Sequence, residues 1–195
     1  MWRENLLIYH RQHQLIVKIV LLGKNDVGKT TLIHKYITDE FIKEHENTKE
    51  INYSYNTTID DKNCELNILD TPGGDTSQIT KETWIKFGNC FLLVYSIDDE
   101  ESLDYIKNIY EEICNLKENE KFSILLVGNK IDLQENGRKV EKKDVESYSN
   151  NECLNFIEIS AFDKDGVNEI FTNVVHDYFV IINMKQTKYG CCHCI

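Results

Sequence analysis

Residues 15–30 read LIVKIVLLGKNDVGKT, a nearly unbroken apolar run followed at once by a glycine-containing turn. A short apolar run without polar alternation is typical of a strand buried on both faces of a parallel sheet. The turn, residues 23–30, fits the pattern G-x-x-x-x-G-K-[ST]. The apolar spacing of residues 30–41 then predicts a helix. Strand, glycine turn and helix in this order predict a loop that cradles a phosphate group.

The chemistry of such a loop explains its residue types. Glycines let successive backbone N–H groups converge on an anion, and the helix N-terminus adds partial positive charge. Lys29 is expected to reach the terminal phosphates and the Thr30 hydroxyl to ligate Mg²⁺. A plain strand-to-helix turn is the alternative, but the flanking elements favour the phosphate interpretation. We assign to this segment Gly23, Lys24, Asn25, Asp26, Val27, Gly28, Lys29, Thr30 and the adjacent Thr31.

Strands and helices alternate along the rest of the chain. We expect strands at residues 53–59, 64–69, 90–97, 122–127 and 156–159, a hairpin turn at 60–63, and helices at 103–116 and 167–184. This alternation predicts an α/β fold with a mostly parallel six-stranded sheet and helices on both faces. In such sheets ligands bind outside the carboxyl ends of the strands.

Two further motifs lie at expected strand ends. Residues 129–132 (NKID) follow a strand directly, and the Asp132 carboxylate can accept hydrogen bonds from the N1–H and 2-amino groups of guanine. Adenine offers neither donor, so a buried carboxylate would reject it. At residues 70–73 (DTPG), Asp70 is expected to hold a water on Mg²⁺ and the Gly73 N–H to contact a γ-phosphate. A P-loop ATPase or kinase conflicts with the NKID motif.

Together these motifs resemble those of the Ras superfamily of small GTPases, from residue 15 to about residue 184. The stretches NILDT and FLLVYSI resemble the Ras branch more than the Rab branch. A Rab-like GTPase of vesicle traffic is the alternative interpretation. The resemblance implies a single-domain P-loop GTPase fold that binds GTP and GDP with Mg²⁺. It also implies nucleotide contacts for Phe41, Thr48, Asn129, Lys130, Asp132, Ser160, Ala161 and Phe162.

Some of these roles are specific. By the resemblance, Phe41 packs against the guanine, Thr48 completes the Mg²⁺ shell as the threonine of the first switch, and the Ala161 N–H meets the guanine carbonyl. The implied mechanism is a two-state switch, in which the γ-phosphate orders two loops that partners read. Exchange factors, effectors and GTPase-activating proteins are implied, but Lys49 and Ile51 differ from Ras, so their identities cannot be carried over.

The chain also departs from the family. Gly74 stands where the family has the glutamine that orients the attacking water, so no catalytic side chain is intact and slow hydrolysis is expected. Rescue by Asp75 or by a partner protein is the alternative. Asn25 would crowd the entry of an activating protein's arginine, and Asp26 puts a negative charge near the phosphates. Phe162 replaces a lysine, a change that leaves the backbone contact of Ala161 in place.

Composition limits the remaining possibilities. The 195 residues are 41% hydrophobic and 28% charged, which suits one globular domain, here residues 15–184, and we expect a monomer. A net charge of −11 without a basic segment argues against nucleic acid as a partner. Residues 1–14 form an extension of undecided role. The four scattered cysteines (Cys64, Cys90, Cys114 and Cys153) are expected to be buried or half-buried thiols.

The tail, residues 185–195, ends in YGCCHCI. Cys192 is fourth from the end, where prenylation occurs, although His193 and Cys194 are poor aliphatic residues for that pattern. One prenyl chain binds membranes only marginally, so Cys191 is expected to carry a second lipid. Unmodified thiols are one alternative, and zinc binding by the tail's Cys and His side chains is another. Lipidation predicts attachment to the cytoplasmic face of a membrane, most simply the plasma membrane.

Overall fold

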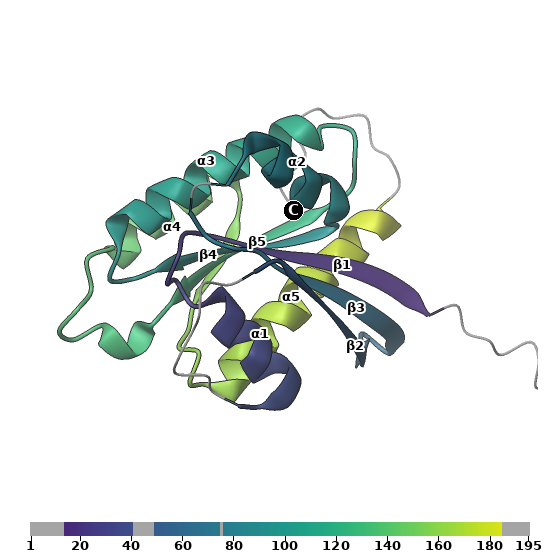
Figure 1. The fold of residues 1–195 in the computed structure, drawn as a ribbon, viewed down its shortest axis with the longest axis horizontal. Helices are drawn as coiled ribbons and strands as arrows, with labels where there is room; N and C mark the ends of the chain where they lie inside the picture. Colours follow the sequence, from purple (N-terminus) through teal and green to yellow (C-terminus); the bar gives the residue numbers. More distant parts are fainter. Residues whose placement is uncertain (1–13, 41–48, 75, 185–195) are drawn as a thin grey trace, which may run out of the picture.

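The computed structural model describes residues 14–40, 49–74 and 76–184. Within them one sheet has the order β2-β3-β1-β4-β5-β6, and every pairing is parallel except the β2–β3 hairpin (Figure 1). The mostly parallel six-stranded sheet is therefore confirmed. Its strands are β1 (Leu15–Leu22), β2 (Ile51–Ile59), β3 (Lys62–Asp70), β4 (Cys90–Ser96), β5 (Ser123–Asn129) and β6 (Asn155–Glu158).

Helices cover both faces of this sheet (Figure 1). On one face lie α1 (Lys29–Thr38) and α5 (Lys164–Asn183). On the other lie α2 (Gln78–Phe87), α3 (Glu100–Leu116) and α4 (Lys142–Glu152). A single 3₁₀ turn, η1 (Ile131–Leu133), follows β5.

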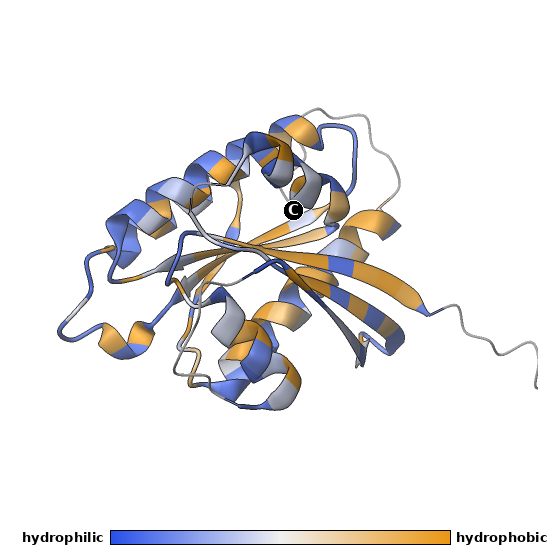
Figure 2. Cartoon of the chain, viewed as in Figure 1, coloured by the Kyte–Doolittle hydropathy of each residue, from blue (hydrophilic) through white to orange (hydrophobic). Residues whose placement is uncertain are grey.

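The packing of β1 explains its unbroken apolar sequence. Val17, Ile19 and Leu21 join the core under α1 and α5, whereas Val20 and Leu22 join the core under α2, α3 and α4. Successive side chains of a strand point to opposite faces, so a strand covered on both sides must be apolar at nearly every position. The central strands are correspondingly mostly apolar in Figure 2.

Several predicted boundaries were wrong, among them those of α1, of the β2–β3 turn and of α5. Helix α1 ends at Thr38 rather than at residue 41, because Asp39 takes the left-handed conformation with φ 62° and caps it. The hairpin turn contains only Asp60 and Asp61, both with positive φ, as the favoured two-residue turn requires. Helix α5 begins three residues early, since the Asp163 side chain accepts a hydrogen bond from the backbone N–H of Asp165.

Two helices were not foreseen in full. In α2 only Trp84 and Ile85 are buried, so the segment carries too little apolar pattern to be recognised. In the charge-rich stretch that begins at residue 135, α4 runs to residue 152 and buries only Val145 and Ser149, so its apolar pattern is equally weak. A thin apolar stripe suffices for these helices because α3 and the sheet supply the rest of the core.

The scattered cysteines follow expectation with one exception. Cys64 and Cys90 are buried and Cys114 is partly buried, but Cys153 is exposed, which corrects the prediction for that thiol. Cys153 caps the C-terminus of α4 with φ 54°. The position is therefore set by the backbone turn rather than by packing of its side chain.

A core substitution between α1 and α5 tests the packing of this face. The rings of Tyr36 and Phe171 stack with centroids 4.1 Å apart, and Phe171 is fully buried. We expect Phe171→Ala to lower the free energy of unfolding by about 3–5 kcal/mol, measured by urea denaturation of the nucleotide-loaded protein. Ile79→Ala, at a side chain that is 79% exposed, is the control and should change it by less than about 0.5 kcal/mol. Equal losses in the two variants would contradict this description of the core.

Candidate nucleotide-binding site

The predicted motifs meet at one edge of the sheet. The parallel strands β1, β3, β4 and β5 end there, at Leu22, Asp70, Ser96 and Asn129. Residues 160–162, just beyond β6, join the same edge, because the Ala161 N–H donates a hydrogen bond to the Asn129 side chain at 3.1 Å. The topology therefore brings together loops that are more than a hundred residues apart in the chain.

The phosphate loop has the backbone that its sequence predicts. Gly28 has φ 97°, and a Cβ there would lie 2.3 Å from Asn129 Nδ2, so only glycine fits. Lys29 folds back over the loop, and its ammonium group donates hydrogen bonds to the carbonyl oxygens of Gly23 and Lys24, each at 2.9 Å. The loop and its lysine thus form a compact, positively charged cradle.

Burial makes the charge of Lys29 costly in the protein alone. The side chain is 6% exposed, and this burial lowers its pKa to about 8, although the charges of Asp70 and Asp26 raise it in part. A buried ammonium ion gains most from an anion placed beside it. The site is therefore electrostatically suited to a phosphate group.

A pair of oxygen ligands lies next to the cradle. The Thr30 hydroxyl donates a hydrogen bond to Asp70 Oδ2 at 2.7 Å, and Asp70 is fully buried at the end of β3. A hydroxyl and a carboxylate are the hard oxygen donors that Mg²⁺ prefers, and Mg²⁺ is bound through few protein ligands plus phosphate and water. These two side chains fit the predicted magnesium site. Thr31, 5% exposed, is buried within α1.

The segment after Asp70 touches the phosphate loop. A Cβ on Gly73 would lie 2.3 Å from the backbone nitrogen of Asn25 and 2.5 Å from the carbonyl carbon of Lys24, so this approach requires glycine. Gly74 has φ 87°, and a Cβ there would lie 2.8 Å from Asn25 Nδ2. Gly74 is thus adjacent to the Asn25 side chain.

A hydrogen bond also joins α2 to the segment just before β2. The Trp84 indole N–H of α2 donates to a carboxylate oxygen of Glu50 at 2.8 Å, just before β2. Trp84 itself is 2% exposed. The Glu50 carboxylate is therefore engaged within the protein.

Asn129 is the first residue of the base loop, residues 129–132, and it joins the phosphate loop, residues 23–30, to residues 160–162. Its side chain is 2% exposed; Nδ2 donates to the Val27 carbonyl at 2.8 Å, and Oδ1 accepts from the Ala161 N–H. Lys130, next in the chain, has the left-handed φ of 66°. Asn129 therefore connects the phosphate loop to residues 160–162, and it is also the first residue of the NKID motif.

The exposure of the Asp132 side chain differs from what the sequence predicts. The carboxylate was expected to be buried, but in the protein alone it is exposed, with Oδ1 accepting a hydrogen bond from the Ser160 hydroxyl at 2.5 Å. It lies on η1, directly after β5, and none of the three residues of η1 is buried. Ser160 and Ala161 are buried, whereas the Phe162 side chain is 58% exposed beside them.

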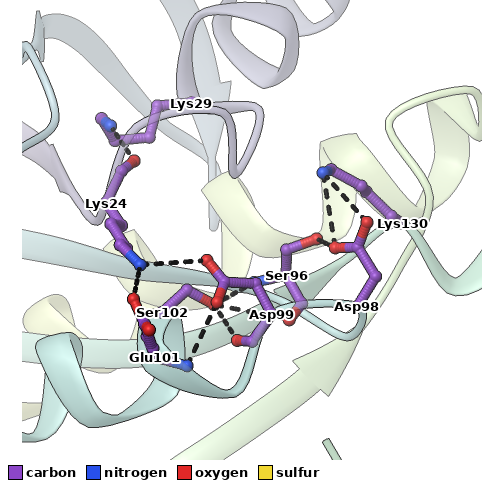
Figure 3. Close-up of polar contacts among 8 residues, drawn as sticks. All are labelled: Lys24, Lys29, Ser96, Asp98, Asp99, Glu101, Ser102 and Lys130. Atoms are coloured by element: carbon purple, nitrogen blue, oxygen red, sulfur yellow. Dashed lines mark hydrogen bonds and ion pairs between the residues drawn. The ribbon is translucent and has the colours of Figure 1, made fainter. Parts of the chain in front are cut away.

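The acidic residues that follow β4 were not predicted to belong to the site. Figure 3 shows Lys24 of the phosphate loop paired with Asp99 and Glu101, and Lys130 of the base loop paired with Asp98. The signal was present, since residues 98–101 read DDEE directly after a strand that ends at the site.

Several predicted residues lie outside the described part of the chain. They are Phe41, Thr48, Asp75, Cys191 and Cys192, together with the extension before residue 14 and the tail after residue 184. Among the residues that are described, none of the helices has the length and apolar character to cross a bilayer.

Comparison with known proteins agrees with the geometry. The family model described as "Ras: Ras family" matches residues 18–179. The Ras-like protein rasB of Dictyostelium discoideum is 35% identical over 160 residues, covering 82% of this chain and 81% of that protein. The Ras-related protein R-Ras of Mus musculus is 34% identical over 158 residues, covering 81% and 72%. The Ras-related protein Ral-a of Drosophila melanogaster is 30% identical over 160 residues, covering 82% and 79%.

Fold and site thus define a P-loop nucleotide-binding protein with a guanine-selective motif. The chain belongs to the Ras family of small GTPases. As in that family, it binds GTP and GDP with Mg²⁺.

The pKa of Lys29 makes nucleotide affinity depend on pH. Phosphate raises a pKa that is about 8 in the protein alone, so binding takes up a proton above that pH. We expect GDP affinity of the nucleotide-free protein to be level below this value. It should then fall by up to about tenfold per pH unit as the pH rises through it, measured by calorimetric titration. Lys29→Arg, whose side chain stays charged, should bind more weakly but without this fall. If the GDP affinity of the native protein did not change with pH, the lowered pKa of Lys29 and its role at the phosphates would be contradicted.

Proposed function

We propose that this protein is a membrane-tethered signalling switch whose intrinsic GTP hydrolysis is slow. The observation that carries the proposal is Gly74, which directly follows the D-x-x-G motif, at the position of the family's glutamine. Most of what a GTPase contributes to this reaction is in-line placement of the attacking water. A glycine has no side chain with which to place it.

The nucleotide contacts proposed for individual residues follow the site geometry. Lys29 and the amides of residues 23–28 hold the phosphates, Thr30 and Asp70 hold Mg²⁺, and Asp132 selects guanine, with Asn129 and Ala161 supporting the base loop. Lys130 and Phe162 flank the base, and Phe162 contributes apolar surface that is exposed in the protein alone. Phe41 and Thr48 complete the guanine and Mg²⁺ contacts, respectively.

Switching would act through Gly73 and Thr48. Gly73 already approaches the phosphate loop closely, so its N–H is near the place that a γ-phosphate would occupy. Exchange factors and effectors would read the loops that the γ-phosphate orders. Each ligand state acts only through contacts that differ between the two conformations.

A second candidate is a binding module that stays loaded with GTP and acts as an adaptor. Asn25 favours it, because its side chain lies beside Gly74 and occupies the side of the phosphate loop where an activating arginine would enter. The paired Thr30 and Asp70 and the close approach of Gly73 favour cycling. The nucleotide that copurifies with the protein separates the two: mostly GDP supports cycling, and mostly GTP supports the adaptor.

Restoring the glutamine tests the cause of slow hydrolysis. Because a residue-74 side chain would meet Asn25, Gly74→Gln is made in the native chain and in an Asn25→Gly background. We expect single-turnover GTP hydrolysis to become about 10- to 100-fold faster with the glutamine, at least where Asn25 is removed. Unchanged rates in both pairs would show that Gly74 is not the limiting departure.

Membrane attachment is proposed to depend on lipids at Cys192 and Cys191. Protein from a eukaryotic host should have an intact mass above that of the bare chain, because each acyl or prenyl group adds mass. The matched control, Cys191→Ser with Cys192→Ser, should have the unmodified mass and should stay in the soluble fraction. A native protein with the bare-chain mass would end this part of the proposal.

A further inference from the structure

An acidic junction separates the phosphate loop from the base loop. It consists of residues 96–102, the end of β4 and the start of α3, and it contains four consecutive acids at 98–101. In the sheet, β4 lies between β1, which leads to the phosphate loop, and β5, which leads to the base loop. The junction is therefore adjacent to both loops, although an acidic segment beside a phosphate site would be expected to weaken anion binding.

This junction is a rigid turn. Ser102 is fully buried; its hydroxyl accepts a hydrogen bond from the Ser96 N–H at 2.9 Å and donates one to the Asp99 carbonyl at 2.6 Å. The Asp99 N–H bonds to the Ser96 carbonyl at 3.0 Å, and the Asp99 side chain caps α3. The Ile97 N–H bonds to the Asn129 carbonyl at 3.1 Å. These contacts order the turn from which Asp98 and Asp99 project.

One carboxylate of the junction holds the lysine of the base loop. Asp98 Oδ1 and Oδ2 lie 3.4 and 3.5 Å from Lys130 Nζ, and Asp98 also accepts a hydrogen bond from the Ser96 hydroxyl (Figure 3). Burial opposes the charge of Asp98, but the Ser96 hydrogen bond and the Lys130 charge outweigh it and lower its pKa. Lys130 is thus fixed both by its left-handed backbone and by its ammonium group.

The next carboxylates hold a lysine of the phosphate loop. Lys24 Nζ lies 3.6 Å from Asp99 Oδ2 and also bonds to Glu101 (Figure 3). The carbonyl oxygen of the same Lys24 accepts a hydrogen bond from Lys29. The position of Lys24 therefore links the acidic junction to the lysine that meets the phosphates.

We infer that Asp98 and Asp99 are positioning residues for nucleotide binding, which act through Lys130 and Lys24 to fix the base loop and the phosphate loop at one spacing. The inference rests on the proposed nucleotide contacts of these loops. Lys130, Lys24 and the junction connect the two sides of the site. Asp98 contacts Lys130 on the base side, and Asp99 with Glu101 contacts Lys24 on the phosphate side. We call these ion pairs the bracket. The acids support nucleotide binding through this bracket, despite their negative charge.

Charge-removing substitutions that keep shape test the bracket. Asp98→Asn breaks the base side, and Asp99→Asn with Glu101→Gln breaks the phosphate side, while asparagine still caps α3. The control is Glu100→Gln, which removes the same charge from an exposed acid that makes no lysine contact among the described residues. Affinities for GDP and for GMP are measured by competition against fluorescent GDP, at low and at high salt.

Both kinds of variant should bind nucleotide more weakly, but they should differ in how much GMP is affected relative to GDP. Asp98→Asn should weaken GDP and GMP equally, by about two- to fivefold at low salt, because both ligands carry the base. The phosphate-side variant should weaken GDP by a similar factor and GMP less, since GMP lacks the second phosphate. Both effects should shrink at high salt as the ion pairs are screened. Glu100→Gln should leave both affinities unchanged or slightly higher.

Other outcomes overturn the inference. Tighter binding in the Asp98 or Asp99 variants would mean that the acids act only by repelling the phosphates. If Glu100→Gln lowered the affinities as much as the other variants do, the effect would be one of overall charge. If the phosphate-side variant lowered the affinities for GDP and GMP equally, Asp99 and Glu101 would not act through the phosphate loop. Failure of the native protein to prefer GDP over ADP would instead contradict the proposed nucleotide contacts.

Discussion

The side-chain amide of Asn129 is the contact on which the site depends. Its two ends bond to Val27 in the phosphate loop and to Ala161 beyond β6, and its nitrogen lies where a side chain on Gly28 would be. Because the group is buried, losing either partner would leave an unsatisfied polar atom, which is costly. One buried amide thus joins the phosphate loop to residues 160–162.

The charges that favour phosphate binding lie within the site and oppose the sign of the chain's net charge. The chain carries a net charge of −11, yet the phosphate loop ends at the N-terminus of α1 and holds the buried ammonium of Lys29. Burial strengthens the interaction of Lys29 with a phosphate and weakens its screening by salt. The nearby acids are engaged with Lys24 and Lys130, so they offset those lysines more than they oppose the nucleotide.

Much of this arrangement could be predicted from the sequence because its signals are contiguous. The buried strand β1, the phosphate loop and the NKID motif are each readable within a few residues. The contacts of Asn129 with Val27 and of Lys130 with Asp98 join positions 102 and 32 residues apart, and no local pattern records them. Helices α2 and α4 were missed in whole or part because they bury few residues, and Asp132 is exposed on η1, which buries none of its three residues.

The central claim is that amides at residues 23–28 bind the phosphates of a nucleotide whose base is selected by Asp132. Titration of nucleotide-free protein with GDP and with ADP, both in the presence of Mg²⁺, measures this selection directly. The account predicts that GDP binds on the order of 10⁴-fold or more tightly than ADP, because adenine leaves the carboxylate without its hydrogen-bond donors. Equal affinity for the two nucleotides would contradict it.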